Sequence, residues 1–285
     1  MANCNSMQSY VILLTACVNP GGMPFTVLND TSERLNQYRE ALDFYLSETI
    51  LPIVFCENTM CDISNEYSEF IESGRMEYIA FNGNDFDKSK GKGFGEAIIL
   101  QTAISRSSLI DEKTMIIKVT GRLKVFNINS LITDNEQIGN EVIQTLFSSS
   151  NMIDSRLIIA PCLFFTEMFL PQSIKISDSD GVFFEHKLYD AIVERKRYSY
   201  YPFLIVPQII GISGSTGNRY VECVCARSVS MFRYDMLGNA MRFDKKCSCS
   251  HFRFWDKIII ILKRCSILIT KASRLYKFPK LIIYK

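Results

Sequence analysis

The sequence predicts an α/β protein with a mostly parallel central sheet. Four apolar segments, at residues 11–14, 53–55, 78–81 and 115–119, each run into a polar or glycine-rich cluster. Continuous apolar strands of this kind, separated by stretches with helical spacing, are typical of parallel sheets that helices cover on both faces. With 285 residues, of which 47% are hydrophobic, the chain is long enough for one such domain with a tail.

Three strand–helix units within the first 120 residues predict a single domain of the Rossmann type. The first strand leads through a loop at 20–22 into a helix at 31–47, for which Thr31 or Ser32 is the expected N-cap. In the first half, the other predicted elements are a strand at 51–55, a polar helix near 64–73, a strand at 77–81, a glycine-rich segment at 91–96 that opens a helix at 97–107, and a strand at 115–119. In the second half, they are strands at 157–160 and 163–165, a helix at 181–195 begun by Asp180, an aromatic turn at 198–201 and a loop at 211–217. Such sheets bind ligands at their carboxyl edge, so the polar clusters form the candidate active site.

Charge divides the chain into two predicted regions, a domain at 1–244 and a tail at 245–285. The tail contains eleven lysines and arginines and a single acid, Asp256, although the whole chain has a formal charge of only +2. Its aromatic residues and the apolar run 258–262 suit a basic amphipathic segment on an anionic membrane surface, and equally a helix packed on the domain. The run is too short to span a bilayer.

Ten cysteines raise the question of compartment, and the N-terminus lacks the basic region and the long apolar core of a signal peptide. We therefore expect a cytoplasmic protein with reduced thiols, peripheral on the inner face of the cytoplasmic membrane if the tail binds lipid. The pairs Cys223/Cys225 and Cys247/Cys249, the second followed by His251, have a C-x-C spacing shorter than that of most zinc sites. No metal ligand is predicted.

Two basic motifs are candidate phosphate sites. In Gly91-Lys92-Gly93-Phe94-Gly95-Glu96, the glycines would let backbone N–H groups approach an anion at a helix N-terminus, although the segment fits neither Walker A nor G-x-G-x-x-G. An ordinary loop into a helix is the alternative. Lys118 and Arg122 lie four residues apart at the end of a strand, so both would reach one phosphate, or each would pair with a helix carboxylate.

A third motif contains the candidate catalytic base. Asp178 and Asp180 form a D-x-D, a carboxylate pair suited to a divalent metal, but they lie too far beyond the fourth strand for that role, and helix capping explains them. Glu185 and His186 follow at the start of the expected helix. A carboxylate or an imidazole there, facing a cleft, suits a general base that deprotonates a sugar hydroxyl.

Together these motifs resemble those of bacterial glycosyltransferases from capsule and O-antigen clusters. The resemblance covers roughly residues 10–220 and lies in Leu13-Leu14-Thr15-Ala16-Cys17-Val18-Asn19-Pro20, in Arg34 and Tyr38, in Phe55-Cys56-Glu57-Asn58, in the glycine-rich segment, in residues 117–122 with Asn127, and in Gly181-Val182-Phe183-Phe184-Glu185-His186. It implies a GT-A-like fold, a nucleotide-sugar donor, and a lipid-linked or oligosaccharide acceptor that grows into a capsule, O-antigen or lipooligosaccharide glycan.

The resemblance also implies roles for particular residues. Glu185, or failing it His186, would be the base, and the donor site would contain Thr15, Pro20, Glu57, Asp85, Lys92, Glu96, Lys118 and Arg122. Tyr198, Tyr200, Tyr201 and the loop 211–218 are candidates to shape the acceptor side, and surface tyrosines with a glycine turn are the simpler alternative. Where the family's D-x-D normally ends the fourth strand, this chain has Thr120-Gly121-Arg122, so we expect a transferase that requires no divalent metal or other cofactor, because cations can stabilise the leaving phosphate directly.

Three other functions compete with this interpretation. A nucleotidyltransferase would use a similar fold but would need a glycine-rich loop on the first strand and metal-binding carboxylates, which the sequence lacks. A nucleic-acid-binding protein would use the basic, aromatic tail, and we do not favour nucleic acid as the partner. A non-catalytic scaffold of polysaccharide assembly would keep the fold and tolerate the loss of Lys118, Arg122 and Glu185.

Overall fold

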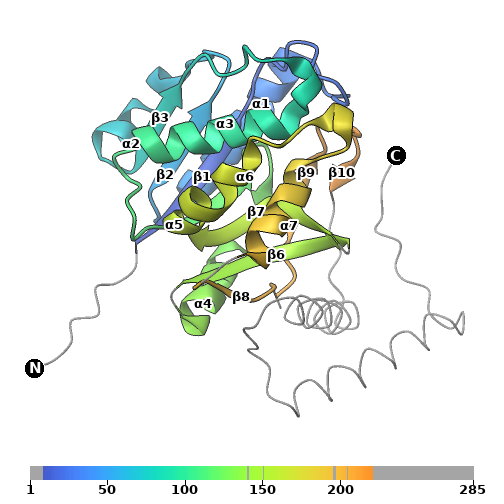
Figure 1. Ribbon diagram of the computed structural model, residues 1–285. Helices are drawn as coiled ribbons and strands as arrows, with labels where there is room; N and C mark the ends of the chain where they lie inside the picture. Colours follow the sequence, from blue (N-terminus) through green and yellow to red (C-terminus); the bar gives the residue numbers. More distant parts are fainter. Residues whose placement is uncertain (1–8, 140, 150, 195–196, 204, 221–285) are drawn as a thin grey trace, which may run out of the picture.

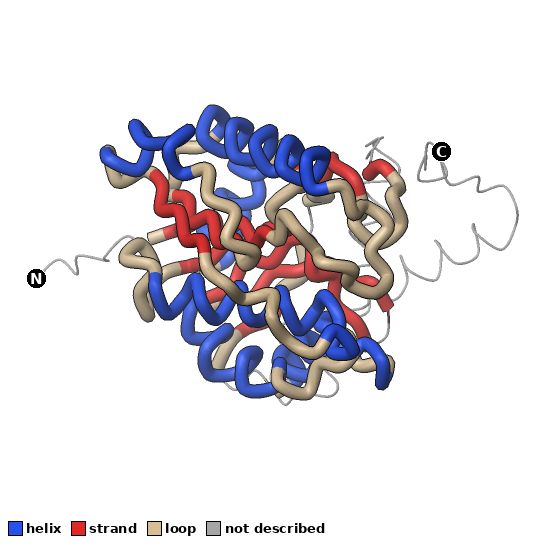
Figure 2. Tube along the Cα trace, turned by 90° about the horizontal axis from the view of Figure 1, so that it is seen from above, coloured by secondary structure: helices blue, strands red, loops and turns tan. Residues whose placement is uncertain are grey.

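A seven-stranded sheet with helices on both faces forms the described part of the chain (Figures 1 and 2). This computed structural model describes residues 9–139, 141–149, 151–194, 197–203 and 205–220. The tail at 245–285, both C-x-C pairs and His251 lie outside the described residues, so the predictions made for them and for a boundary near residue 244 stay predictions.

The sheet has a parallel half and a mixed half. Its strands are β1 (Tyr10–Ala16), β2 (Ile53–Glu57), β3 (Met76–Ala80), β4 (Met115–Thr120), β6 (Val142–Ser149), β7 (Met152–Pro161) and β8 (Ser199–Tyr200). They are ordered β3-β2-β1-β4-β7-β6-β8. Strands β1 to β4 are parallel to one another. Strand β7 is antiparallel to both β4 and β6, and β8 is parallel to β6. The predicted α/β class with a mostly parallel, Rossmann-type sheet is therefore confirmed.

Alternation along β1 explains why both faces of the sheet are covered. Val11 and Leu13 belong to the core on one face, and Ile12 and Leu14 belong to the core on the other. The helical segments are α1 (Thr31–Glu48), η1 (Ser64–Tyr67), α2 (Ser68–Glu72), η2 (Lys88–Lys90), α3 (Gly91–Arg106), α4 (Ile128–Ile138), α5 (Cys162–Phe164), the π-helix η3 (Phe165–Phe169), α6 (Leu170–Ser173), η4 (Asp178–Asp180) and α7 (Phe184–Val193). Helices α1 and α4 pack on one face, and α3 and α7 pack on the other.

Helix α1 begins at Thr31, directly after its N-cap residue Asp30. The side chain of Asp30 accepts a hydrogen bond of 2.7 Å from the backbone N–H of Glu33, and Asp30 itself is extended. The predicted helix is confirmed, but the expected cap at Thr31 or Ser32 is wrong, because Asp30 precedes them and a carboxylate satisfies the free N–H groups of the first turn.

A small second sheet lies beside the carboxyl edge of β4. It consists of β5 (Lys124–Val125), β9 (Ile209–Ile212) and β10 (Arg219–Tyr220) in the order β10-β9-β5. Strands β9 and β10 are an antiparallel pair, so the loop expected at 211–217 is mainly the connection between them. This connection reaches back to the first strand–helix loop, because the N–H of Val27 donates to the Gly214 carbonyl at 2.9 Å.

Three predictions for the second half of the chain are wrong. Residues 163–165 are helical, not a strand. The last long helix begins at Phe184, and the preceding η4 contains Asp180, which therefore does not cap it. Tyr198 and Tyr200 are buried, and β8 pairs with β6, so the predicted aromatic turn is part of the core and the sheet. Among the described helices, none combines the length and the apolar character that crossing a bilayer requires.

Candidate active site

A cavity of about 240 Å³ opens at the point where the chain switches faces of the sheet. The connections β1–β2 and β2–β3 run on the face of α1, whereas β3 connects to β4 through α3 on the opposite face. The connections next to β1 and β4 therefore lie on opposite faces of the sheet and leave a crevice between the carboxyl ends of these two strands. Open α/β sheets bind their ligands in such a crevice.

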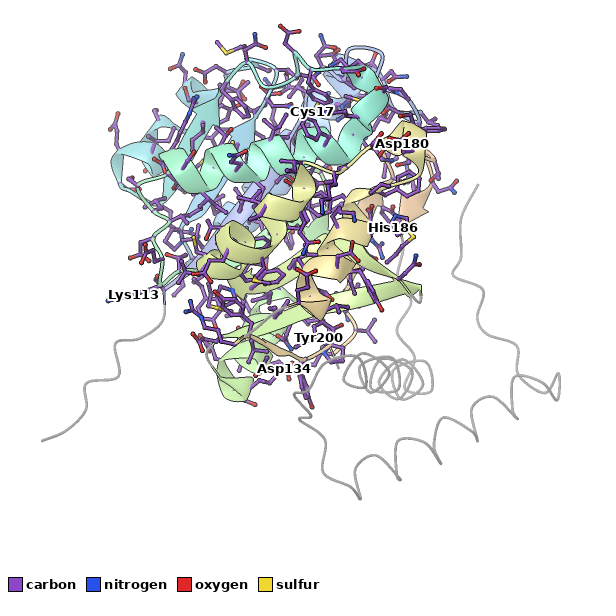
Figure 3. All side chains as sticks on the ribbon, in the orientation of Figure 1. Cys17, Lys113, Asp134, Asp180, His186 and Tyr200 are labelled. Atoms are coloured by element: carbon purple, nitrogen blue, oxygen red, sulfur yellow. The ribbon has the colours of Figure 1, made fainter. Side chains whose placement is uncertain are left out.

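The cavity is lined by loops and helices from both faces. Its polar or charged lining residues are Thr15, Cys17, Thr26, Arg34, Tyr38, Asn58, Asn84, Lys92, Glu96, Thr120, Arg122, Ser155, Arg156, Asp178, Glu185, Ser213, Ser215 and Tyr220. Pro20 also lines it. In Figure 3, Cys17 lies near the top of the molecule and Tyr200 lies far from it, near the bottom of the described part. The predicted acceptor role of Tyr198 and Tyr200 therefore has no support from their position, since both are core residues.

Glu185 presents a carboxyl group to the cavity from the first turn of α7. Its oxygen accepts a hydrogen bond of 2.7 Å from the Ser155 hydroxyl. Protein surrounds most of the carboxyl group, and this desolvation raises the pKa of Glu185, with a further contribution from Glu96, while the Ser155 hydroxyl opposes the shift. A buried carboxyl with a raised pKa in a cleft is a candidate for proton transfer.

Glu96 and Lys118 form a charged pair next to Glu185. Lys118 is fully buried on β4, its Nζ contacts the Glu96 carboxylate, and it donates to the Ser155 carbonyl at 2.6 Å. Thr15 at the end of β1 donates to the same Glu96 at 3.3 Å. The structure thus brings together four predicted site residues, namely Thr15, Glu96, Lys118 and Glu185. Lys118 does not line the cavity, and its ammonium pairs with Glu96.

Two residues that line the cavity each have a buried polar side-chain atom with no hydrogen-bond partner within the described residues. One is Oδ1 of Asn58, just after β2, and the other is Nε of Arg122, just after β4. Arg122 is held through Nη1, which donates to Gln37 and to the Ile212 carbonyl at 3.0 Å each. Buried polar groups are nearly always paired, so an unpaired acceptor and an unpaired donor in one cavity suggest contacts that a ligand completes.

The glycine-rich segment forms the first turns of α3, and one of the chain's own carboxylates lies at the start of that helix. Asp178 occupies the start of α3, where its carboxylate accepts the backbone N–H of Lys92. Gly91 has a φ of +79°, and a Cβ there would lie 1.9 Å from the Asp178 carboxyl group. The chain's own carboxylate thus takes the helix N-terminus at which we expected a phosphate, while the Lys92 ammonium reaches across to Ser215.

Besides Lys118, three other predicted site residues, Asp85, His186 and Glu57, do not line the cavity. Asp85 is exposed. The Nδ1 atom of His186 accepts the backbone N–H of Phe183 at 3.1 Å, and its ring stacks on the ring of Phe183, so it caps α7. Glu57 is fully buried, and its carboxylate accepts from the N–H groups of Val18, Thr59 and Cys61 at 2.8–3.0 Å.

Glu57 therefore holds the two loops that follow β1 and β2. We expect Glu57→Gln to lower the free energy of unfolding by about 2–3 kcal/mol, because the amide nitrogen would face N–H donors and charge-assisted bonds would be lost. Urea denaturation would measure this. Glu66→Gln, which removes the exposed ion pair with Arg39, is the control, with an expected loss of less than about 1 kcal/mol. Equal losses in the two variants would contradict this role of Glu57.

Sequence reasoning missed several residues that the cavity brings together. Ser155 and Arg156 lie on β7, and Asp178 was interpreted as part of a cap. Only the tertiary structure places them at the end of β4, because β7 runs antiparallel to it. Asn58 does carry a local signal, since it follows β2 directly at the predicted edge.

Among the described residues, no group of three or more His, Cys, Asp or Glu side chains is arranged to hold a metal ion. The predicted absence of a metal requirement is a statement about activity and stays a prediction. Four thiols of the described chain, Cys17, Cys56, Cys61 and Cys162, are free, and burial raises the pKa of Cys17 to about 11. Cys17 is therefore not a reactive thiolate at neutral pH.

Comparisons with known proteins give low similarity. No family model and no curated protein matches the chain. Mouse xyloside xylosyltransferase 1 in its apo form is 9% identical with a TM-score of 0.36, over 68% of this chain and 84% of that one. The 4-diphosphocytidyl-2C-methyl-D-erythritol synthase of Anaerococcus prevotii is 10% identical with a TM-score of 0.36, over 81% of this chain and 97% of that one. Similarity at this level does not define the chemistry of this chain, which is judged from its own cavity.

Proposed function

We propose that this protein is a glycosyltransferase that uses a nucleotide-sugar donor. The observation that carries the proposal is one cavity, at the switch point of a Rossmann-type sheet, that holds both a carboxyl with a raised pKa and a buried arginine with an unpaired donor. A transferase that works by direct displacement can use both groups, one for the acceptor proton and one for the leaving phosphate.

The proposed reaction uses these groups at opposite ends of the bond being exchanged. Glu185 takes the proton of an acceptor hydroxyl as its oxygen attacks the anomeric carbon of the donor. The bond from that carbon to the phosphate oxygen breaks, and Arg122 stabilises the negative charge on the departing nucleotide. If the acceptor and the phosphate lie on opposite faces of the sugar, one displacement inverts the anomeric centre.

The order of strands suggests how the donor lies. Asn58 follows β2 and Arg122 follows β4, two strand spacings apart, or about 10 Å. A sugar ring is shorter than this span, whereas the base and the phosphate of one nucleotide are separated by a ribose. We place a base N–H against Asn58 and the phosphate against Arg122, so that the sugar points toward Ser155 and Glu185.

The finer features of the proposal rest on the sequence resemblance. They are a lipid-linked or oligosaccharide acceptor belonging to a capsule, O-antigen or lipooligosaccharide, independence from divalent metal, and a cytoplasmic location that includes the membrane surface if the tail binds lipid. A CMP-linked donor suits the cationic cavity as well, since its single phosphate carries less charge than a diphosphate.

A thermal-shift screen against UDP-, GDP-, dTDP- and CMP-sugars, each with Mn²⁺ and with EDTA, tests the proposal. A ligand at about 100 times its dissociation constant stabilises the native state by about 2.7 kcal/mol. We expect one nucleotide class to raise the melting temperature in EDTA, and that donor to support transfer. No shift with any donor would favour a scaffold or a nucleic-acid-binding protein.

Two substitutions then locate the donor. Asn58→Leu and Arg122→Gln should each weaken donor binding about tenfold or more, because each removes a hydrogen bond worth about 1.4 kcal/mol or more in a desolvated site. Isothermal titration calorimetry would measure the affinity. Arg75→Gln is the matched control, since Arg75 also has a buried, unpaired nitrogen but does not line the cavity. Equal weakening in all three variants would place the donor elsewhere.

A further inference from the structure

The Lys118 ammonium is enclosed by the protein itself. Its side chain is fully buried, and Nζ contacts the Glu96 carboxylate and donates to the Ser155 carbonyl at 2.6 Å. The ring centroid of Phe184 lies 5.4 Å from Nζ, within the range of a cation–π contact. An ammonium has three N–H donors, so these groups account for the lysine without a ligand.

Two hydrogen bonds continue from this ammonium to the cavity. Thr15 donates to Glu96 at 3.3 Å, and the Ser155 hydroxyl donates to Glu185 at 2.7 Å. Ser155 therefore accepts from Lys118 through its carbonyl and donates to Glu185 through its side chain. Since one residue makes both contacts, Lys118 holds the piece of backbone from which the hydroxyl reaches Glu185.

We propose that Lys118 is a positioning residue for Glu185, acting through Glu96 and Ser155. It fixes the hydrogen bond and the neighbouring charge that Glu185 experiences, in place of the direct phosphate contact that its strand position suggested. The inference rests on the proposed function only where it takes Glu185 as the base, and the physical coupling among these residues can be measured without any substrate.

The surroundings of Glu185 set the sign of each expected effect. Burial raises its pKa most, the Ser155 hydroxyl lowers it, Glu96 raises it and Lys118 lowers it. These neighbours come from β7, α3 and β4.

Three other titratable or charged groups lie nearby. Arg156 of β7 and Asp178 of η4 line the same cavity, and Arg156 is paired with Asp154 at 2.6 Å. His186, next to Glu185 on α7, has its Nδ1 occupied by the N–H of Phe183. The variants below leave all three unchanged.

The test is a carbon-13 NMR titration of the glutamate carboxyl groups, with Glu185 assigned through Glu185→Gln. Lys118→Met and Ser155→Ala should move the titration of Glu185 to higher pH by about one pH unit or more, because each removes a contact that favours the carboxylate. Glu96→Gln should move it to lower pH, because it removes a neighbouring negative charge. A purely structural role of the network would not give opposite signs.

A second measurement separates positioning from phosphate binding. With a donor found by the screen, Lys118→Met should lower kcat at neutral pH about tenfold or more and leave the donor dissociation constant within about twofold. Lys124→Met on β5, which removes an ion pair with Glu40 of α1, should change neither quantity. A loss of donor affinity with unchanged kcat would overturn the positioning role and restore the phosphate contact.

The NMR titration and the measurements with a donor test the coupling and the proposed function separately. If no nucleotide sugar binds, the proposed function fails while the NMR titration still decides the coupling. If Lys118→Met does not fold, Ser155→Ala and Glu96→Gln still give the opposite shifts that the proposal requires. An unchanged Glu185 titration in Ser155→Ala and Glu96→Gln overturns the inference even if the protein is an active transferase.

Discussion

Glu185→Gln should lower kcat for sugar transfer by about 10²–10⁴-fold and leave donor affinity unchanged. Glutamine keeps the size of the side chain and still accepts the Ser155 hydroxyl, but it cannot take the acceptor proton. Steady-state kinetics with the donor identified by the screen would measure kcat, and calorimetry would measure donor binding. Glu194→Gln, at the other end of α7 and exposed, is the control and should retain full activity.

The same substitution should make the protein more stable above the pKa of Glu185. Burial raises that pKa in the folded state, so the glutamate's contribution to folding is complete below its unfolded pKa and is lost as the pH rises through its folded pKa. Glutamine is neutral throughout and avoids this loss. Melting curves of the two proteins should therefore agree at low pH and diverge at neutral pH. A variant with full activity would remove Glu185 as the base, and one that is less stable at neutral pH would contradict the raised pKa of Glu185.

Gly91→Ala should lower the free energy of unfolding by about 3–5 kcal/mol. The substitution imposes a φ of +79° with a ψ of 178°, a combination that essentially only glycine adopts, on a residue with a side chain, which costs about 1–3 kcal/mol. It also places a methyl group 1.9 Å from the Asp178 carboxyl, so Asp178 must leave the N-terminus of α3 and lose a charge-assisted hydrogen bond worth about 1.5–3 kcal/mol. Urea denaturation would measure the loss.

Gly74→Ala separates the two contributions. Gly74 has a φ of +73°, close to that of Gly91, but a Cβ there would meet nothing within 4 Å. It should therefore lose only the conformational part, about 1–2 kcal/mol. The double substitution Gly91→Ala with Asp178→Ala should be less than additive, because the clash is already removed. Equal losses in Gly91→Ala and Gly74→Ala would mean that Asp178 does not hold α3.

Local patterns predicted the first half of the fold well. Strands β1 to β4 and helix α1 appear within a few residues of the predicted ranges, because apolar runs and helical spacing are properties of adjacent residues. The prediction failed at 163–165, where a short apolar run suits a buried helix as well as a strand. It failed again at Tyr198 and Tyr200, whose burial depends on pairing between β8 and the distant strand β6.

The candidate site shows the same division. Thr15, Pro20, Lys92, Glu96, Arg122 and Glu185 line the cavity as the sequence predicted, because strand ends and helix starts collect at one edge of a parallel sheet. Glu57 and His186 were chosen for their chemistry, yet their side chains satisfy backbone N–H groups that are exposed only in the folded loops. Their roles in binding or catalysis have no support from their position.

By itself, the sequence determined the α/β class, the parallel half of the sheet and the edge at which polar residues gather, since each depends on spacing along the chain. Only the tertiary structure decided which charges meet. Asp178 reaches Gly91, Lys118 reaches Glu96 and Ser155, and Glu185 reaches Ser155 across separations of 22 to 87 residues. Burial then makes pairing necessary, because an isolated charge in a desolvated site is far less stable than one with a partner.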